Sequence, residues 1–242
     1  ILIMTTVNLG QHIHHRYDNE LESLRSRVVS MGGLAERQIS DALTALRDHN
    51  LELAQYVIRT DHRLNAQEVN IDEDCTYILA RRQPAAGDLR MVMSIIKTIT
   101  DIERIGDESE NIAKITIRHA ESVSLGLDNI MQQITDMGLL VRNSLREALD
   151  SFVRMDVDAA VQTALKDEEI DQRYVALQTT LTEHIKEAQQ DTEECQSLLW
   201  VIRSLERIGD HSKNICEYII YLVKGKDVRH TTTDELEQEA GY

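Results

Sequence analysis

The chain of 242 residues carries 42 acidic and 26 basic side chains, a formal net charge of −16, and this balance argues against direct binding to a nucleic-acid backbone, which needs a basic surface. Its 42% hydrophobic residues can fill a core, whereas one proline and ten glycines supply few turns for a sheet protein, so the composition favours an all-α fold. No apolar run reaches the roughly 18 residues of a membrane span, and three scattered cysteines suit buried thiols in a reducing compartment, so we expect a cytoplasmic protein without membrane insertion.

Six long helices are predicted, because apolar residues recur at spacings of three and four. After an irregular start at residues 1–10, their expected spans are about Leu21–Leu46, Leu51–Arg82, Asp88–Ser122, Leu127–Met155, Val157–Gln190 and Thr192–Lys224. The expected N-caps are Asp88 and Asp156, Asp191 with Glu194 forms a capping box, and Gly225 ends the last helix. Helices of this length span about 45 Å each, so three antiparallel helices per half predict an elongated bundle and two bundles a rod.

The second half of the chain repeats the first. The segment IERIGDESENI at Ile102–Ile112 returns as LERIGDHSKNI at Leu205–Ile215, an offset of 103, and residues further upstream align at an offset of 106. A repeat of this length is far longer than a solenoid unit, so it predicts two fused copies of one small domain related by a pseudo-twofold axis. We expect a first three-helix bundle at residues 1–123, a second at 124–225 and a charged, mobile tail at 226–242.

The repeated motif places two carboxylates one helical turn apart in each copy. The pairs are Glu103 with Asp107, and Glu206 with Asp210. Acidic pairs at this spacing should arise by chance at roughly seven places in so acidic a chain, so one pair alone means little. These two stand out because they recur in register and because each contains a mid-helix glycine. Such a glycine costs about 0.5–1 kcal/mol, which a closely approaching backbone or ligand would have to offset.

The preceding helix of each half adds further polar side chains. In the second half Asp167 and Asp171 lie one turn apart beside the apolar stripe, and in the first half the matching positions are Asp61 and Asn65. If these flanks face the motif helices, several carboxylates converge, and such clusters favour hard cations such as iron, manganese, magnesium or calcium. From spacing alone, a solvated acidic face paired with neighbouring arginines and lysines remains the alternative.

The duplicated ERIGD helices, the turn Ala80-Arg81-Arg82-Gln83-Pro84 and the ending Tyr221–His230 closely resemble the PhoU family of bacterial phosphate-signalling accessory proteins. The resemblance covers essentially the whole chain, from about Leu9 to His230. It implies two three-helix bundles and a cytoplasmic negative regulator of the phosphate-starvation response. Such a regulator is not an enzyme, and it connects the phosphate-specific ABC transporter to a sensor histidine kinase.

The resemblance also implies a metal cofactor. Family members carry multinuclear iron or zinc clusters on their E(D)xxxD surfaces. Matched residue by residue, the implied metal ligands are Asp61, Glu103 and Asp107 in the first half, and Asp167, Asp171, Glu206 and Asp210 in the second half. Asn65 departs from the pattern, because a neutral amide is a weaker ligand than Asp171, so the first site is expected to be depleted or to recruit Glu68 and Asp72.

A helix-bundle carboxylate metal protein, either a di-iron enzyme or an iron store, is the alternative from a different class. Those sites normally take Glu-x-x-His from two helices, and none of the nine histidines has glutamate three positions before it, which counts against this alternative. A homodimer is expected for a protein of such long helices. Trp200 is expected to pack between helices, and His211 to meet solvent.

Overall fold

The computed structural model describes residues 9–118, 127–187, 192–229 and 231, with residues 9–16 described as backbone only. Within these ranges the chain forms seven α-helices and no strand, which confirms the all-α class. The helices are α1 Leu9–Arg47, α2 Leu51–Arg82, α3 Ala86–Arg118, α4 Asp128–Arg154, α5 Val157–Leu165, α6 Asp167–Glu187 and α7 Thr192–Lys224. None of the described helices combines the length and the apolar character that crossing a membrane requires.

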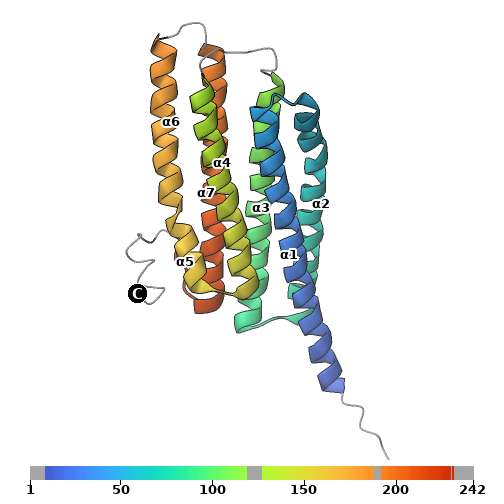
Figure 1. Cartoon of the computed structure of the whole chain (residues 1–242). Coiled ribbons are helices and arrows are strands. Elements are labelled where there is room, and N and C mark those ends of the chain that lie inside the picture. The colour runs from blue at the N-terminus through green and yellow to red at the C-terminus, as the bar shows by residue number, and fades with distance from the viewer. Residues whose placement is uncertain (1–8, 119–126, 188–191, 230, 232–242) are drawn as a thin grey trace, which may run out of the picture.

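The helices form two bundles, one from each half of the sequence (Figure 1). In the first, α3 packs against both α1 and α2; in the second, α7 packs against α4, α5 and α6. The core is almost entirely aliphatic, as the low aromatic content predicts, and isoleucines such as Ile95, Ile99 and Ile102 of α3 are fully buried. Burying these side chains supplies the main drive for packing three helices together.

The two bundles lie side by side and do not continue one another into a rod (Figure 1). The most extensive helix contact among the described residues joins α3 to α7, and α1 also packs against α4. Helices α3 and α7 are therefore buried on two faces, one inside their own bundle and one between the bundles. His211 lies in this interface at 8% exposure, and its Nδ1 donates a hydrogen bond to Asp101 Oδ1 at 2.7 Å, so the expectation that it meets solvent is wrong.

Several helix boundaries differ from those predicted. The single helix expected at Val157–Gln190 is interrupted at Lys166, whose backbone N–H donates to Thr163 O at 3.2 Å in a tightened turn, while its ammonium pairs with Glu147 of α4 at 2.6 Å. The third helix starts at Ala86, so Asp88 lies in its first turn and does not cap it. The first helix begins at Leu9, within the stretch expected to be irregular.

Two predicted helix ends are confirmed. Asp156 accepts a hydrogen bond from the Ala159 N–H at 3.0 Å and so caps α5. Gly225 follows α7 with a φ of 74°, the left-handed conformation that favours glycine after a helix. The capping residue Asp191 lies outside the described residues, as do the boundary at 123/124 and most of the tail at 226–242, so the predicted domain limits stay predictions.

Candidate metal centre

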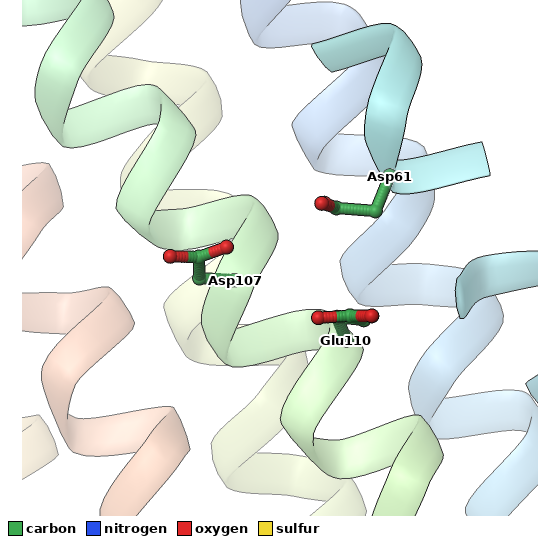
Figure 2. A group of neighbouring side chains, drawn as sticks. All are labelled: Asp61, Asp107 and Glu110. Carbon is green, nitrogen blue, oxygen red and sulfur yellow. The ribbon is translucent and has the colours of Figure 1, made fainter. Parts of the chain in front are cut away.

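Three carboxylates from two helices converge in the first bundle. Asp61 of α2 lies beside Asp107 and Glu110 of α3, and one oxygen from each lies within 4.8 Å of the others (Figure 2). Asp61 is only 6% exposed, and the other two side chains are half-buried. Carboxylates so close together repel one another unless protons or a cation reduce their charge, and hard cations prefer oxygen ligands of this kind.

Gly106 allows the helices around this group to approach closely. A Cβ atom at this position would lie 2.5 Å from Leu64 Cδ2, and 3.1 Å from both Asp61 Oδ1 and Gln38 Oε1. Its repeat counterpart Gly209 has a similar role, because a Cβ there would lie 3.0 Å from a methyl carbon of Ile170. The mid-helix glycines are thus accounted for by close neighbours, although side chains, and not the backbone, make the approach.

Two amide side chains hold Asp61 in place. Gln38 Nε2 donates to Asp61 Oδ1 at 3.2 Å, and Asn65 Nδ2 donates to Asp61 Oδ2 at 3.0 Å. In this arrangement the amide oxygens Gln38 Oε1 and Asn65 Oδ1 are buried and have no hydrogen-bond partner among the described residues. Buried polar atoms normally have a partner, and amide oxygens are good ligands for hard cations, so the surroundings of Asp61 fit a bound cation.

The electrostatics of the group are those of mutually repelling acids. Burial raises the pKa of Asp61, and the neighbouring Glu110 raises it further. Burial also raises the pKa of Asp107, with Asp61 and Glu110 adding to the effect, and burial together with Asp107 raises the pKa of Glu103. Lys114 pairs with Glu110 at 2.5 Å and Arg104 lies near Glu103, but the two cations offset only part of this repulsion. Because repulsion between the carboxylates remains, an additional positive charge would stabilise the group.

In the second bundle two of the four acidic side chains form ion pairs with cationic side chains. Asp167, which is 4% exposed, accepts a hydrogen bond from Lys213 Nζ at 3.0 Å, and Glu206 accepts one from Arg203 at 2.6 Å. Burial raises the pKa of Glu206, and Asp210, Asp171 and Asp167 raise it further, so the acidic side chains still interact with one another. Asp167 Oδ1 and Glu206 Oε2 are buried without a partner among the described residues, although Asp171 and Asp210 are exposed.

One exchange of charge distinguishes the two halves. At the offset of 103 that relates the motif helices, Glu110 of α3 corresponds to Lys213 of α7. The first half therefore places a third carboxylate where the second half places an ammonium group. Sequence reasoning missed Glu110 because it centred on the repeated Glu-Arg-Ile-Gly-Asp motif, which ends at Asp107; the place of Glu110 three residues later, on the same helical face, was the available signal.

The seven predicted ligands are thus brought together unequally. Asp61 and Asp107 belong to the convergent group, whereas Glu103, Asp167, Asp171, Glu206 and Asp210 form no group of that closeness among the residues the structure describes. Asn65 donates a hydrogen bond to Asp61 while Glu110 supplies a third carboxylate, and the depletion expected for the first site stays a prediction. Glu68 and Asp72 are not members of the group either, although Glu68 contributes to the raised pKa of Glu103.

Fold and site together define a duplicated, all-α protein whose bundles carry clustered carboxylates on their long central helices. The PhoU domain matches this chain twice, over residues 28–116 and 134–219. The chain belongs to the PhoU family. Among its relatives are the "Phosphate-specific transport system accessory protein PhoU homolog" of Pseudomonas putida, 45% identical and covering 92% of this chain and 86% of the relative. The "Phosphate-specific transport system accessory protein PhoU" of Escherichia coli (strain K12) is 41% identical, covering 97% and 96% of the two chains.

Solved structures agree with this assignment. The crystal structure of PhoU from Pseudomonas aeruginosa superposes with a TM-score of 0.83 at 42% identity, covering 87% of this chain and 100% of that one. The phosphate transport system regulatory protein PhoU from Streptococcus pneumoniae superposes with a TM-score of 0.80 at 33% identity, covering 88% and 99%. The tandem-bundle architecture predicted from the duplication is therefore confirmed.

Proposed function

We propose that this chain is the accessory protein of a phosphate-specific transport system and a cytoplasmic negative regulator of the phosphate-starvation response. The observation that carries the proposal is similarity along nearly the whole chain, at 41–45% identity, to relatives named as accessory proteins of that system. The similarity extends over both halves of the chain and over 96% of the Escherichia coli relative. An accessory protein is not an enzyme, and no catalytic step is assigned to it.

The proposed mode of action is that of an adaptor between the phosphate ABC transporter and a sensor histidine kinase. The side-by-side bundles are similar in fold but differ in charge where Glu110 and Lys213 exchange, so the two halves present related yet distinct surfaces. Such a pair suits one partner on each half, or two copies of the chain joined as a homodimer with the remaining faces available. Phosphate status would then pass through the conformation of the transporter.

A metal cofactor, either iron, zinc or another divalent cation, forms part of the proposal. In the first bundle Asp61, Asp107 and Glu110 would hold it, with Gln38 or Asn65 offering an amide oxygen; Glu103 lies on the same acidic surface. In the second, Asp167, Asp171, Glu206 and Asp210 would provide the ligands. When bound, the cation supplies positive charge that relieves carboxylate repulsion and so stiffens contacts between neighbouring helices. A di-iron enzyme or iron store gains no support, since the convergent group contains three carboxylates and no histidine.

Deleting the gene tests the regulatory role. Without this protein, phosphate-starvation genes should stay switched on in phosphate-rich medium, as measured by transcript levels. Supplying the intact chain on a plasmid should restore repression, whereas a chain with Asp61→Asn and Asp107→Asn should restore it poorly if the metal matters for signalling. Normal repression in the deletion strain would overturn the proposed role.

A further inference from the structure

A hollow of about 450 Å³ lies between the C-terminal part of α3 and the N-terminal part of α7. Four cationic side chains line it: Lys114, Arg118, Arg203 and Arg207. Glu108 is the single carboxylate of its lining, so cationic side chains outnumber acidic ones in this wall on a chain whose net charge is −16. The size is in the range of small-molecule sites, and the charge calls for an anion.

The same hollow exposes a large aromatic ring. Trp200 forms part of its wall and is 68% exposed, which contradicts the expectation that it packs between helices. Ile115 is the only other large apolar side chain in the lining. An exposed indole face beside guanidinium groups is suited to stacking against a planar ring.

A comparison of the two halves shows that the hollow depends on the size of the side chains that line it. At the equivalent place on the other side of the pseudo-twofold axis, Lys97 stands for Trp200, while Tyr218 and Tyr221 stand for Ile115 and Arg118. There the Lys97 ammonium lies 5.4 Å from the Tyr218 ring centre and 5.6 Å from that of Tyr221, so these three side chains occupy the space together. Because Ile115 and Arg118 stand where the equivalent place has two tyrosines, the space beside Trp200 is left open.

The arginines of the hollow are held in place with hydrogen-bonding capacity to spare. Arg207 Nη1 bonds Glu108 Oε1 at 2.6 Å, and Arg203 Nη1 bonds Glu206 Oε1 at 2.6 Å. A guanidinium has five N–H donors, and each of these ion pairs uses one of them. The remaining donors can bind phosphate oxygens in pairs, the geometry in which arginine recognises phosphate.

We propose that this hollow is a binding site for a nucleoside di- or triphosphate. The phosphates bind Arg118, Arg203 and Arg207, with Lys114 at the edge, and the base stacks on Trp200. Lys114, Arg203 and Arg207 each pair with one carboxylate, so the positive charge offered to an anionic ligand comes from Arg118 and from the donors that these ion pairs leave unused. The exposed indole gives a planar base a surface that inorganic phosphate could not use. An acidic peptide fits less well, because the lining offers only two large apolar anchors. The site adjoins the acidic groups, because Lys114 pairs with Glu110 and Arg203 with Glu206, but none of its proposed phosphate contacts requires a bound metal.

Fluorescence gives a direct test, because Trp200 is the only tryptophan of the chain. ATP is titrated into the full-length protein in EDTA at physiological salt, with calorimetry in parallel. We expect saturable quenching, with AMP, pyrophosphate and inorganic phosphate each binding more weakly. Absence of saturable binding up to about 10 mM, near the weak limit of measurable affinity, overturns the proposal. Equal binding of pyrophosphate and ATP overturns it as well, as does binding of poly-glutamate without binding of ATP.

Matched variants locate the site. By calorimetry, Arg118→Gln and Arg207→Gln should each weaken ATP binding by about tenfold, since each removes a charged hydrogen-bonding group. Trp200→Ala should weaken it similarly, whereas Trp200→Phe should retain most of the affinity. Arg104→Gln is the control, because Arg104 is the repeat counterpart of Arg207 on the other half. Circular dichroism confirms folding of each variant, and equal loss of affinity in Arg104→Gln and the two hollow variants would overturn the assignment.

Discussion

At the scale of the residue, position 110 and its counterpart 213 decide how each half balances its acidic side chains. Glu110 adds a third carboxylate to Asp61 and Asp107, whereas Lys213 forms an ion pair with Asp167 at 3.0 Å. In the second bundle the Lys213 ammonium, which is part of the protein, supplies the positive charge that a metal ion would otherwise supply. The first bundle is therefore the one whose carboxylate group most needs an external cation.

Exchanging the residues at positions 110 and 213 should change which bundle binds an external cation. Glu110→Lys should lower the metal content of the purified, untagged protein, because the new ammonium neutralises Asp61 and Asp107 internally. Lys213→Glu should create a convergent carboxylate group in the second bundle and raise the metal content. Elemental analysis measures both, and Glu169→Lys, at an exposed acidic position of α6, controls for net charge. Unchanged metal content in both exchange variants would remove the assignment of these ligands.

The raised pKa values of Asp61 and Asp107 predict how stability depends on pH. A carboxyl group whose pKa is raised in the folded protein binds more protons there than in the unfolded chain. Its favourable contribution is present below the unfolded pKa, near 4, and is lost as pH rises through the folded pKa. The metal-free protein should therefore lose stability from this group as the pH rises above about 4.

A divalent cation should restore that stability. Thermal melts with Mn²⁺ or Zn²⁺ in excess over EDTA-treated protein should show a larger rise in Tm at pH 7 than at pH 4.5, where protons compete for the same oxygens. Asp61→Asn should reduce the rise at pH 7. An equal rise in Tm at both pH values, or one unaffected by Asp61→Asn, would contradict binding at these carboxylates.

At the scale of the element, close packing of α1 and α2 against α3 depends on the absence of a side chain at Gly106. The nearest neighbours of a Cβ there are buried side-chain atoms of Leu64, Asp61 and Gln38. Helix propensity alone would favour alanine at this position by about 1 kcal/mol, so packing outweighs propensity. The same argument applies less strongly to Gly209, where the closest approach is 3.0 Å instead of 2.5 Å.

Three glycine-to-alanine variants separate packing from propensity. Gly106→Ala should destabilise the fold by about 1–3 kcal/mol, because Leu64 is buried and must move. Gly33→Ala should stabilise it by about 0.5–1 kcal/mol, since its only close neighbour is Arg37 at 3.8 Å. Gly209→Ala should fall between them. Denaturant unfolding measures all three, and a Gly106→Ala protein as stable as Gly33→Ala would show that close packing is not the reason for this glycine.

At the scale of the whole molecule, polar contacts buried between α3 and α7 join the two bundles. Asp101 is 1% exposed and accepts hydrogen bonds from His211 at 2.7 Å and from Asn214 at 3.3 Å. Its repeat counterpart is Ser204, so this contact exists on one side of the pseudo-twofold axis only. Buried hydrogen bonds of this kind fix how two packed surfaces align with one another.

Removing the shared acceptor should weaken the junction between bundles. Asp101→Ala should destabilise the protein by about 1–3 kcal/mol, because His211 and Asn214 lose a buried acceptor. We expect the loss to separate unfolding into two steps, visible in calorimetry as a broadened or split transition, since each bundle retains its own core. Ser204→Ala is the control on the opposite side of the axis, and a stability loss as large there would show that the contact has no special role.

Much of this protein is determined by its sequence alone. Helical periodicity, scarce breakers and the repeat of the ERIGD segment are local or pairwise properties, so they predict helices, duplication and the family without reference to packing. Contacts between distant segments are decided only in three dimensions. Whether the bundles lie end to end or side by side, and where Trp200 emerges, depend on the second buried face of α3 and α7. The contacts of Glu110 and Lys213 with aspartates depend on how α2 and α6 pack inside each bundle. Periodicity reports how much of a helix is apolar, but not which other helix covers it.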